Sequence, residues 1–367
     1  MKPVYFPLAL LAAGCAFGAS AQAQSDVSVY GIVDAALVSE RGGAAGHINK
    51  LTSGTSAYSR LGFRGKEDLG DGLSAIFLLE LGMRIDDGSL DNTNGQLFNR
   101  QAYIGLESRD WGAVRLGRQH TFLYYTLVQV ADPFSLGYAG TAKNLFPVKN
   151  TVRSSNTISY TSPTRQGWTA EASFSLGEQA ADAHAGSQLG LAIGYAAGPL
   201  TVRFAHSTLN QDVAAGTAPG VAPVSQENAR NSVLAMNYRY AWLTAYLAYG
   251  VDKGVNSSPV PNPDAYGTAS AVMPSTDSSD LLLGASIPVG QQGRVMASFI
   301  RKNDKTRFRQ DASQWALGYT YKLSPRTTAY LAWAQIHNRN GAAYTVGNGN
   351  EAGSGNSAFN LGLRHNF

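Results

Sequence analysis

Trp168-Thr169-Ala170-Glu171-Ala172-Ser173-Phe174-Ser175-Leu176 is a segment in which two kinds of side chain strictly alternate. The even-numbered positions carry Trp, Ala, Ala, Phe and Leu, and the odd-numbered positions carry Thr, Glu, Ser and Ser. Because successive side chains of a β-strand point to opposite faces, the segment predicts a strand with one apolar and one polar face.

The same period of two recurs along the whole chain, whereas the 3.6-residue period of an amphipathic helix is not sustained anywhere. A soluble β-sandwich would also alternate, but long loops rich in Gly, Ala, Ser and Asn after every second strand are not usual there. We count about sixteen alternating segments, at 26–39, 57–67, 73–84, 98–107, 112–119, 151–162, 167–177, 187–197, 200–208, 229–239, 241–252, 279–288, 293–303, 312–322, 326–338 and 357–367.

The connections between these segments alternate in length. Short ones lie at 67–72, 108–111, 162–166, 197–199 and 323–326. Long ones lie at 40–56, 85–97, 119–150, 209–228, 253–278 and 339–356. Short turns at one rim and long loops at the other are typical of bacterial outer-membrane barrels. The sequence therefore predicts an all-β fold, a 16-stranded antiparallel transmembrane β-barrel, which is wide enough to enclose water.

The composition fits this fold and excludes other classes of protein. Charged residues make up 15%, against about 25% in globular proteins, and the mean hydropathy is −0.15. After residue 25 there is no run of apolar residues long enough for a transmembrane helix. In a membrane barrel only every second residue faces lipid, so the mean hydropathy stays near that of a soluble protein. The net charge of +4 is too small, without clustering, to indicate binding of nucleic acid.

The N-terminus has the features of a secretory signal peptide. Met1-Lys2 supplies a positive charge, residues 3–20 are largely apolar, and Ala21-Gln22-Ala23 offers a small-x-small cleavage site. We expect residues 1–23 to be cleaved, which leaves 24–367 as a single barrel domain. A lipoprotein is the alternative, because Leu11-Ala12-Ala13-Gly14-Cys15 resembles a lipid-attachment box. Cys15 is the only cysteine, so the cleaved chain has no disulfide and no thiolate metal site.

One connection, 119–150, is too long for an ordinary loop and too aromatic for a disordered linker. Its aromatic residues are Phe122, Tyr124, Tyr125, Phe134, Tyr138 and Phe146. We predict that it folds inward and constricts the lumen of the barrel.

Several segments resemble those of general-diffusion porins of Gram-negative outer membranes, most of all the trimeric 16-stranded type of betaproteobacteria. They are Ser28-Val29-Tyr30-Gly31, the segment 58–73 (YSRLGFRGKEDLGDGL), 98–106 (FNRQAYIGL), 116–119 (LGRQ) and the C-terminal 362–367 (GLRHNF). The resemblance spans essentially the whole cleaved chain. It implies a homotrimer in the outer membrane, in contact with lipid and lipopolysaccharide. It also implies that the terminal Phe367 is the signal for the barrel-insertion machinery.

In that family three arginines form a ladder on one wall of the constriction and face acidic groups on the inward loop. By resemblance the ladder here is Arg60, Arg100 and Arg153. Alternation supports Arg60 and Arg153 as lumenal, whereas Arg100 shares its parity with the apolar Ile104. Arg64, Arg118, Glu80, Glu171 and Asp34 are further lumenal candidates.

On the loop side the sequence departs from the family pattern. Asp132, in Asp132-Pro133-Phe134, is the only acid between Arg118 and Arg153, and Lys143 and Lys149 add positive charge. We therefore expect a pore with net positive charge that passes small hydrophilic solutes and ions and prefers anions. Alternatively, the arginines only satisfy loop carbonyls and hydrogen bonds of the barrel.

Two other functions remain open at this stage. A substrate-selective porin would have a lumenal binding site, for which Tyr124, Tyr125 and Phe134 could form a stacking track. A barrel enzyme would need a nucleophile and a base at the rim, and His120 is the candidate for that base. No metal-binding or phosphate-binding motif occurs, so we expect no metal and no cofactor.

Overall fold

The computed structural model describes residues 26–92, 95–147, 152–180, 182–214, 224–259, 263–266 and 274–367. The strands are β1 (Asp26–Gly43), β2 (Gly46–Ser53), β3 (Arg60–Gly70), β4 (Leu73–Gly82), β5 (Gln101–Ser108), β6 (Gly112–His120), β7 (Arg153–Thr161), β8 (Trp168–Ser175), β9 (Gln188–Ala197), β10 (Leu200–Leu209), β11 (Ala229–Tyr240), β12 (Leu243–Lys253), β13 (Asp277–Val289), β14 (Gly293–Asp304), β15 (Ala312–Lys322), β16 (Thr327–Asn338) and β17 (Ser357–Asn366). The predicted signal peptide, 1–23, lies outside the described residues. No helix in the described ranges is long and apolar enough to cross a membrane.

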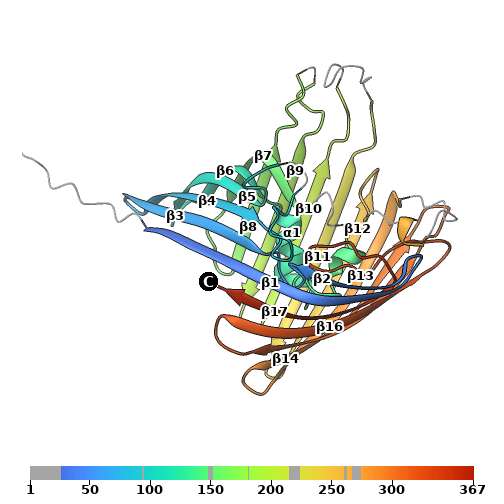
Figure 1. Cartoon of the computed structure of the whole chain (residues 1–367). Coiled ribbons are helices and arrows are strands. Elements are labelled where there is room, and N and C mark those ends of the chain that lie inside the picture. Colours follow the sequence, from blue (N-terminus) through green and yellow to red (C-terminus); the bar gives the residue numbers. More distant parts are fainter. Residues whose placement is uncertain are drawn as a thin grey trace, which may run out of the picture.

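The strands form one antiparallel sheet that closes on itself. From β3 onward each strand pairs with the next in the chain, and β17 pairs with β1 from Ile32↔Asn366 to Arg41↔Ser357. Figure 1 shows β1 in blue beside β17 in red. Closure leaves no sheet edge whose N–H and C=O groups would face lipid. The predicted 16-stranded barrel is confirmed.

Two strands, β2 and β3, lie end to end beside β1 and together take the position of one strand in the barrel wall. Asp26–Ile32 of β1 pairs with β3, and Ala35–Gly43 pairs with β2, so two strand pieces occupy one position. Between these pieces the chain leaves the wall at 54–59. The prediction of a plain loop at 40–56 was therefore wrong, because most of that segment is the hairpin of β1 and β2.

Asp34 holds the break at 54–59 in place. Its carboxylate accepts hydrogen bonds from the backbone N–H of Ser56 at 3.2 Å, from the Ser56 hydroxyl, and from the Tyr330 hydroxyl at 2.8 Å. Asp34 is fully buried. It was predicted as a lumenal charge, but its carboxylate oxygens accept hydrogen bonds from the barrel wall and from the break, so its role is structural.

Short and long connections alternate around the barrel as predicted. After β3 the short turns are 71–72, 109–111, 162–167, 198–199, 241–242, 290–292 and 323–326. They lie at the same rim as the start of β1 and the end of β17. In outer-membrane barrels this short-turn rim faces the periplasm.

Outward and inward faces differ in side-chain size, as Trp315 and Gly318 of β15 illustrate. Trp315 and Leu317 point outward and are 61% and 54% exposed. Gly318 points inward, where a Cβ atom would lie 2.7 Å from the ring of Phe134. Large apolar residues thus face lipid, and small residues leave room for a segment inside the barrel.

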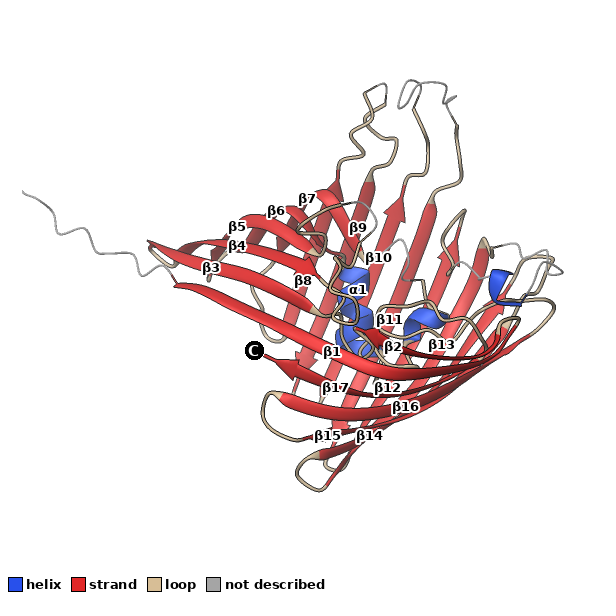
Figure 2. Ribbon diagram, in the orientation of Figure 1, coloured by secondary structure: helices blue, strands red, loops and turns tan. Residues whose placement is uncertain are grey.

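That segment is the connection between β6 and β7, described at 121–147. It forms α1 (Phe122–Thr126), a π-helical turn (Leu127–Ala131) and a 3-10 turn (Ala142–Asn144). Figure 2 shows these helices, in blue, inside the ring of red strands. Its apolar side chains are buried against inward residues of β9 to β16, and this is the hydrophobic core of the protein. The inward fold predicted for 119–150 is confirmed for the described part.

Candidate functional site

Three cationic side chains from three segments of the chain meet around the ring of Tyr58, which lies in the break at 54–59. Lys143 Nζ is 4.4 Å from the ring centroid, Arg100 Cζ is 4.7 Å away and Arg153 Cζ is 5.5 Å away. A cation over an aromatic face is attracted by the ring quadrupole. The ring therefore gathers one cation from the inward loop and two from the opposite wall.

Lys143 is also fixed by hydrogen bonds. Its Nζ donates to the hydroxyl of Tyr58 at 2.9 Å and to the backbone carbonyl of Gly349. Burial acts to raise the pKa of Tyr58, but the charges of Lys143 and Arg153 outweigh it and lower this pKa. The lowered pKa reflects the strength of the positive field at this point.

Among the described residues, Glu80 of β4 is the carboxylate that pairs directly with arginines of the cluster. It accepts a hydrogen bond from Arg100 Nε at 2.6 Å and one from the Tyr30 hydroxyl at 2.9 Å, and it pairs with Arg60 Nε at 3.4 Å. Glu80 and Arg100 are 3% and 1% exposed. Four cations and one carboxylate leave the cluster with a net charge of three positive units.

Some guanidinium nitrogens of the cluster are buried without a hydrogen-bond acceptor among the described residues. They are Arg153 Nε and Nη2, Arg100 Nη1 and Arg60 Nε, the last of which has only the ion pair with Glu80 at 3.4 Å. An unsatisfied buried donor costs free energy, and the cost is larger for a charged group. These donors therefore favour water or an anion as their partner.

The three predicted ladder arginines come together, but strand alternation does not explain two of them. Arg100 precedes β5, so alternation does not apply to it. In β7 a bulge at Asn156, with φ 54°, puts Ser154 and Thr157 on the same face, where both contact Ser175. Arg153 reaches the site because it is the first residue of its strand.

Asp132 does not face the arginines, which corrects the expectation from sequence. It is 2% exposed, and its carboxylate accepts backbone N–H groups of Phe134, Leu136 and Ala142, each at 2.9 Å. Burial raises its pKa to about 6. Asp132 therefore ties together the turn of the inward loop, and its carboxylate is not exposed to the lumen.

The three aromatic residues predicted to form a stacking track do not form one, because each has different contacts. Phe134 is fully buried against β15, so it cannot stack on a solute. Tyr124 stacks on His120 with centroids 4.3 Å apart, and the Tyr125 hydroxyl donates to Gln101 at 3.5 Å. His120 contacts the carbonyl of Val152 at 3.2 Å through Nδ1, a structural contact rather than one to a nucleophile.

Comparison with known proteins places these features in a family. Residues 9–341 match the model of a family described as Gram-negative porin. The chain belongs to this porin family.

Two curated relatives of this porin span nearly its whole length. An outer membrane porin protein of Bordetella pertussis is 30% identical over 90% of this chain and 93% of its own. Outer membrane porin protein 32 of Delftia acidovorans is 31% identical over 100% of both chains. The porin is accordingly a β-barrel of the bacterial outer membrane.

Among solved structures, the anion-selective porin from Comamonas acidovorans superimposes with a TM-score of 0.72. It is 28% identical, and the match covers 94% of this porin and 100% of that chain. OmpT of Vibrio cholerae, in a trimer form, has a TM-score of 0.64 at 15% identity, with 94% and 99% coverage, and shares the fold.

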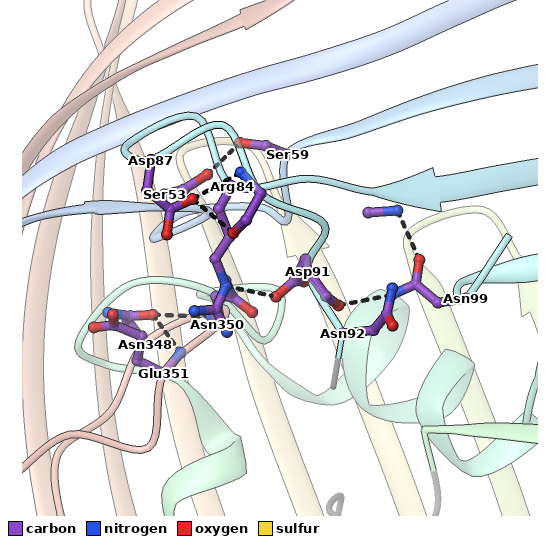
Figure 3. Close-up of polar contacts among 12 residues, drawn as sticks. Ser53, Ser59, Arg84, Asp87, Asp91, Asn92, Asn99, Asn348, Asn350 and Glu351 are labelled. Atoms are coloured by element: carbon purple, nitrogen blue, oxygen red, sulfur yellow. Dashed lines mark hydrogen bonds and ion pairs between the residues drawn. The ribbon is translucent and has the colours of Figure 1, made fainter. Parts of the chain in front are cut away.

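Loops at the long-loop rim of the porin hold the segments beside the cluster, and Figure 3 shows polar contacts within these loops. Asn99 accepts from the backbone of Gly82 at 2.8 Å and donates to the carbonyl of Asp91 at 2.7 Å, which fixes the residue next to Arg100. Asn348 accepts two backbone N–H groups, of Asn350 and Glu351, each at 2.9 Å. This turn presents the Gly349 carbonyl to Lys143.

The other predicted lumenal residues have individual partners. Glu171 pairs with Arg203, whose Nε donates to Thr126 of α1 at 2.8 Å, so this pair anchors the inward loop. Arg118 donates to the carbonyl of Asn99 and to the Ser155 hydroxyl, both at 2.7 Å.

Arg64 lies toward the periplasmic rim. It donates to the Ser28 hydroxyl at 2.9 Å and lies 5.5 Å from the centroid of the Tyr30 ring. It does not contact Tyr58 and is not part of the cluster.

Sequence reasoning missed a buried charged group on β12, β13 and β14. Lys302 pairs with Asp280 at 2.8 Å and with Asp252 at 3.3 Å, and all three side chains are fully buried. It also missed the role of Tyr58, for which the only signal was its place beside Arg60 in the family motif. The buried group is closed off by protein, so it lines no water-filled part of the pore.

Proposed function

We propose that this porin forms a water-filled channel for passive diffusion of small hydrophilic solutes and ions, with a preference for anions. The observation that carries the proposal is the cluster around Tyr58, with Arg60, Arg100, Arg153 and Lys143 against the carboxylate of Glu80. It lies where the inward loop meets the opposite wall, so permeating solutes must pass close to it.

Guanidinium groups keep their protons even when crowded. The cluster therefore cannot relieve its repulsion by losing charge. At a few ångströms, in a partly low-dielectric pore, one unit charge acts on another with roughly 1–4 kcal/mol before screening. Such an energy raises the occupancy of anions and lowers that of cations, as rings of Arg or Lys do in anion pores. The anion-selective porin from Comamonas acidovorans, similar over 94% of this chain, supports the same preference.

The test is the reversal potential of single channels in a planar bilayer under a roughly tenfold gradient of KCl. We expect ohmic conductance and a reversal potential on the anion side for the wild type. Arg60→Ala with Arg153→Ala should move the reversal potential toward the cation side. An unchanged potential would mean that the arginines serve only the packing of the barrel, and a wild-type barrel without conductance would contradict the channel itself.

We further propose a homotrimer that carries out no covalent chemistry. The trimer form of OmpT of Vibrio cholerae, which shares the fold, supports the oligomer. Against an enzyme, His120 is taken up by stacking on Tyr124 and contacting Val152. Crosslinking of the detergent-purified protein, read by mass, tests the oligomer.

The proposed partners besides solutes and ions are lipid, lipopolysaccharide and the barrel-insertion machinery. Phe367 supports the last of these, because it is part of barrel closure: its backbone N–H donates to the Gly31 carbonyl at 3.1 Å, and its carbonyl accepts from Gly31. Deletion of Phe367 tests this by measuring the yield of folded barrel in the outer membrane.

A further inference from the structure

A cavity of about 580 Å³ lies between the inward loop and the short-turn rim, and none of the residues of the Tyr58 cluster lines it. Pro133 and Phe134 of the loop form its roof, and the turn 290–292 forms its outer edge. Its walls come from strands β11 to β17. Because the short turns of such barrels face the periplasm, the cavity opens toward that side.

Four basic side chains line this cavity: Arg239 of β11, Arg294 of β14, Lys322 of β15 and Arg364 of β17. We call these four residues the basic vestibule. Among the described residues that line the cavity, none is an aspartate or a glutamate. The positive charge of the vestibule is thus not balanced within its own walls.

The partners of these residues are neutral or incomplete. Arg294 Nη2 donates to the hydroxyls of Tyr246 and Ser286, each at 2.9 Å, and these fix the guanidinium without neutralising it. Arg364 Nε is buried and has no acceptor in the described part of the chain. Asp34 is opposite Arg364 in register and attracts its charge, so Arg364 is partly balanced by a carboxylate behind the wall, which also accepts three hydrogen bonds at the break. Arg239, Arg294 and Lys322 form no ion pair with a carboxylate in the described part of the chain.

A second cavity at the same rim differs sharply in charge. It has a volume of about 970 Å³ and lies along β1 and β3 to β7. Its lining alternates acids with bases, and Lys66 pairs with Glu107 at 2.7 Å. Its charged residues are Asp26, Asp68, Glu107, Lys66, Arg109 and Arg115. The rim therefore has one balanced side and one basic side.

We propose that the basic vestibule is a binding site for small solutes that carry a phosphate or diphosphate group. A polyvalent anion can contact several of the four cations at once, whereas chloride neutralises one. Arginine suits this role because its planar fork donates two parallel hydrogen bonds to phosphate oxygens, and basic walls concentrate anions locally. The site rests on the proposed channel function and adds to it a solute class and a side of entry.

The experiment uses the whole porin in a planar bilayer at neutral pH in about 0.1 M NaCl, with inorganic pyrophosphate added to one side at a time. We expect pyrophosphate to lower the chloride conductance at lower concentration from the short-turn side than from the long-loop side. Arg294→Gln with Lys322→Gln should raise the half-blocking concentration at least about 10-fold. Lys322→Gln alone should raise the half-blocking concentration about 3-fold. Because Lys322 is exposed, this single variant should fold and still tests the site if the double variant misfolds.

Lys66→Gln with Arg109→Gln is the matched control, because it removes the same charge from the balanced cavity at the same rim. It should leave the half-blocking concentration within about 2-fold of wild type. Equal shifts for both double variants, or block that only Arg60→Ala with Arg153→Ala relieves, would overturn the proposal. Chloride conductance without pyrophosphate tests the channel separately, so a conducting porin that pyrophosphate does not block would overturn the vestibule site alone.

Discussion

Lys143 and Tyr58, 85 residues apart in sequence, are joined by a hydrogen bond of 2.9 Å from Nζ to the phenol oxygen. One belongs to the inward loop and the other to the break in the wall. The bond therefore links the inward loop directly to the break in the wall at this site.

The ring of Tyr58 should matter more than its hydroxyl. Tyr58→Ala removes the surface shared by Lys143, Arg100 and Arg153, so their repulsion spreads them, and we expect the anion-to-cation permeability ratio to fall roughly two-fold. Tyr58→Phe keeps the ring and should keep the ratio. Reversal potentials of the three proteins decide this, and identical values for all of them would contradict a role for the ring.

Removing the carboxylate of Glu80 should have opposite effects on selectivity and stability. Glu80→Gln takes away the negative charge of the cluster, so anion preference should increase in reversal-potential measurements. It also leaves the buried Arg100 without its ionic partner, which typically costs about 3–5 kcal/mol. Urea unfolding in detergent measures this cost. The control is Glu107→Gln, because Glu107 and its partner Lys66 are 42% and 56% exposed, and it should change stability by less than about 1 kcal/mol.

Gly318 and Gly194 allow a test of how tightly the loop is packed against the wall. A Cβ at Gly318 would lie 2.7 Å from Phe134, whereas one at Gly194 has its nearest neighbours at 3.9 Å. Gly318→Ala should lower the free energy of unfolding by about 1–3 kcal/mol through overpacking and alter the single-channel conductance. Gly194→Ala should do neither. A silent Gly318→Ala would show that the loop can move away from β15.

Asp132 predicts a pH effect of defined sign. Burial raises the pKa of Asp132 in the folded protein to about 6, above its ordinary value of 3.8, so the folded state binds this proton more tightly than the unfolded state. Above about pH 6.5 the buried carboxylate is charged and lowers the free energy of unfolding by an amount on the order of 3 kcal/mol. Below about pH 4 the carboxyl is protonated in both states and this destabilisation is absent. The measurement is the unfolding free energy of wild type minus that of Asp132→Asn, which should increase as the pH falls through this range. A constant difference would contradict the assignment.

The fold was predictable because the lipid imposes its pattern on every strand. Trp168 and Phe174 of β8 are 52% and 41% exposed on the outward face, as their alternation predicts. The break at 54–59 was not predictable in the same way. It depends on hydrogen bonds from Ser56 and Tyr330 to Asp34, which are remote in sequence and leave no periodic signal.

The positively charged residues of the site could be predicted from the sequence better than the positions of its carboxylates. Alternation could place Arg60 on the lumenal wall, whereas Arg153 lies beyond a bulge in its strand and its place at the site follows from the family resemblance. A carboxylate within a loop can equally turn toward backbone N–H groups, as Asp132 does. Glu80 was identified as lumenal, but only the structure reveals that it lies between Arg60 and Arg100.

The packing of the inward loop against β9 to β16 has a consequence for how such a channel can diversify. Because the contacts that set the width of the passage are also the core of the protein, a substitution that alters the size cut-off must also alter folding stability. The charged side chains on the opposite wall are under no such constraint where they lack buried partners. The preference for anions or cations can therefore change between related porins while the width of the passage stays the same.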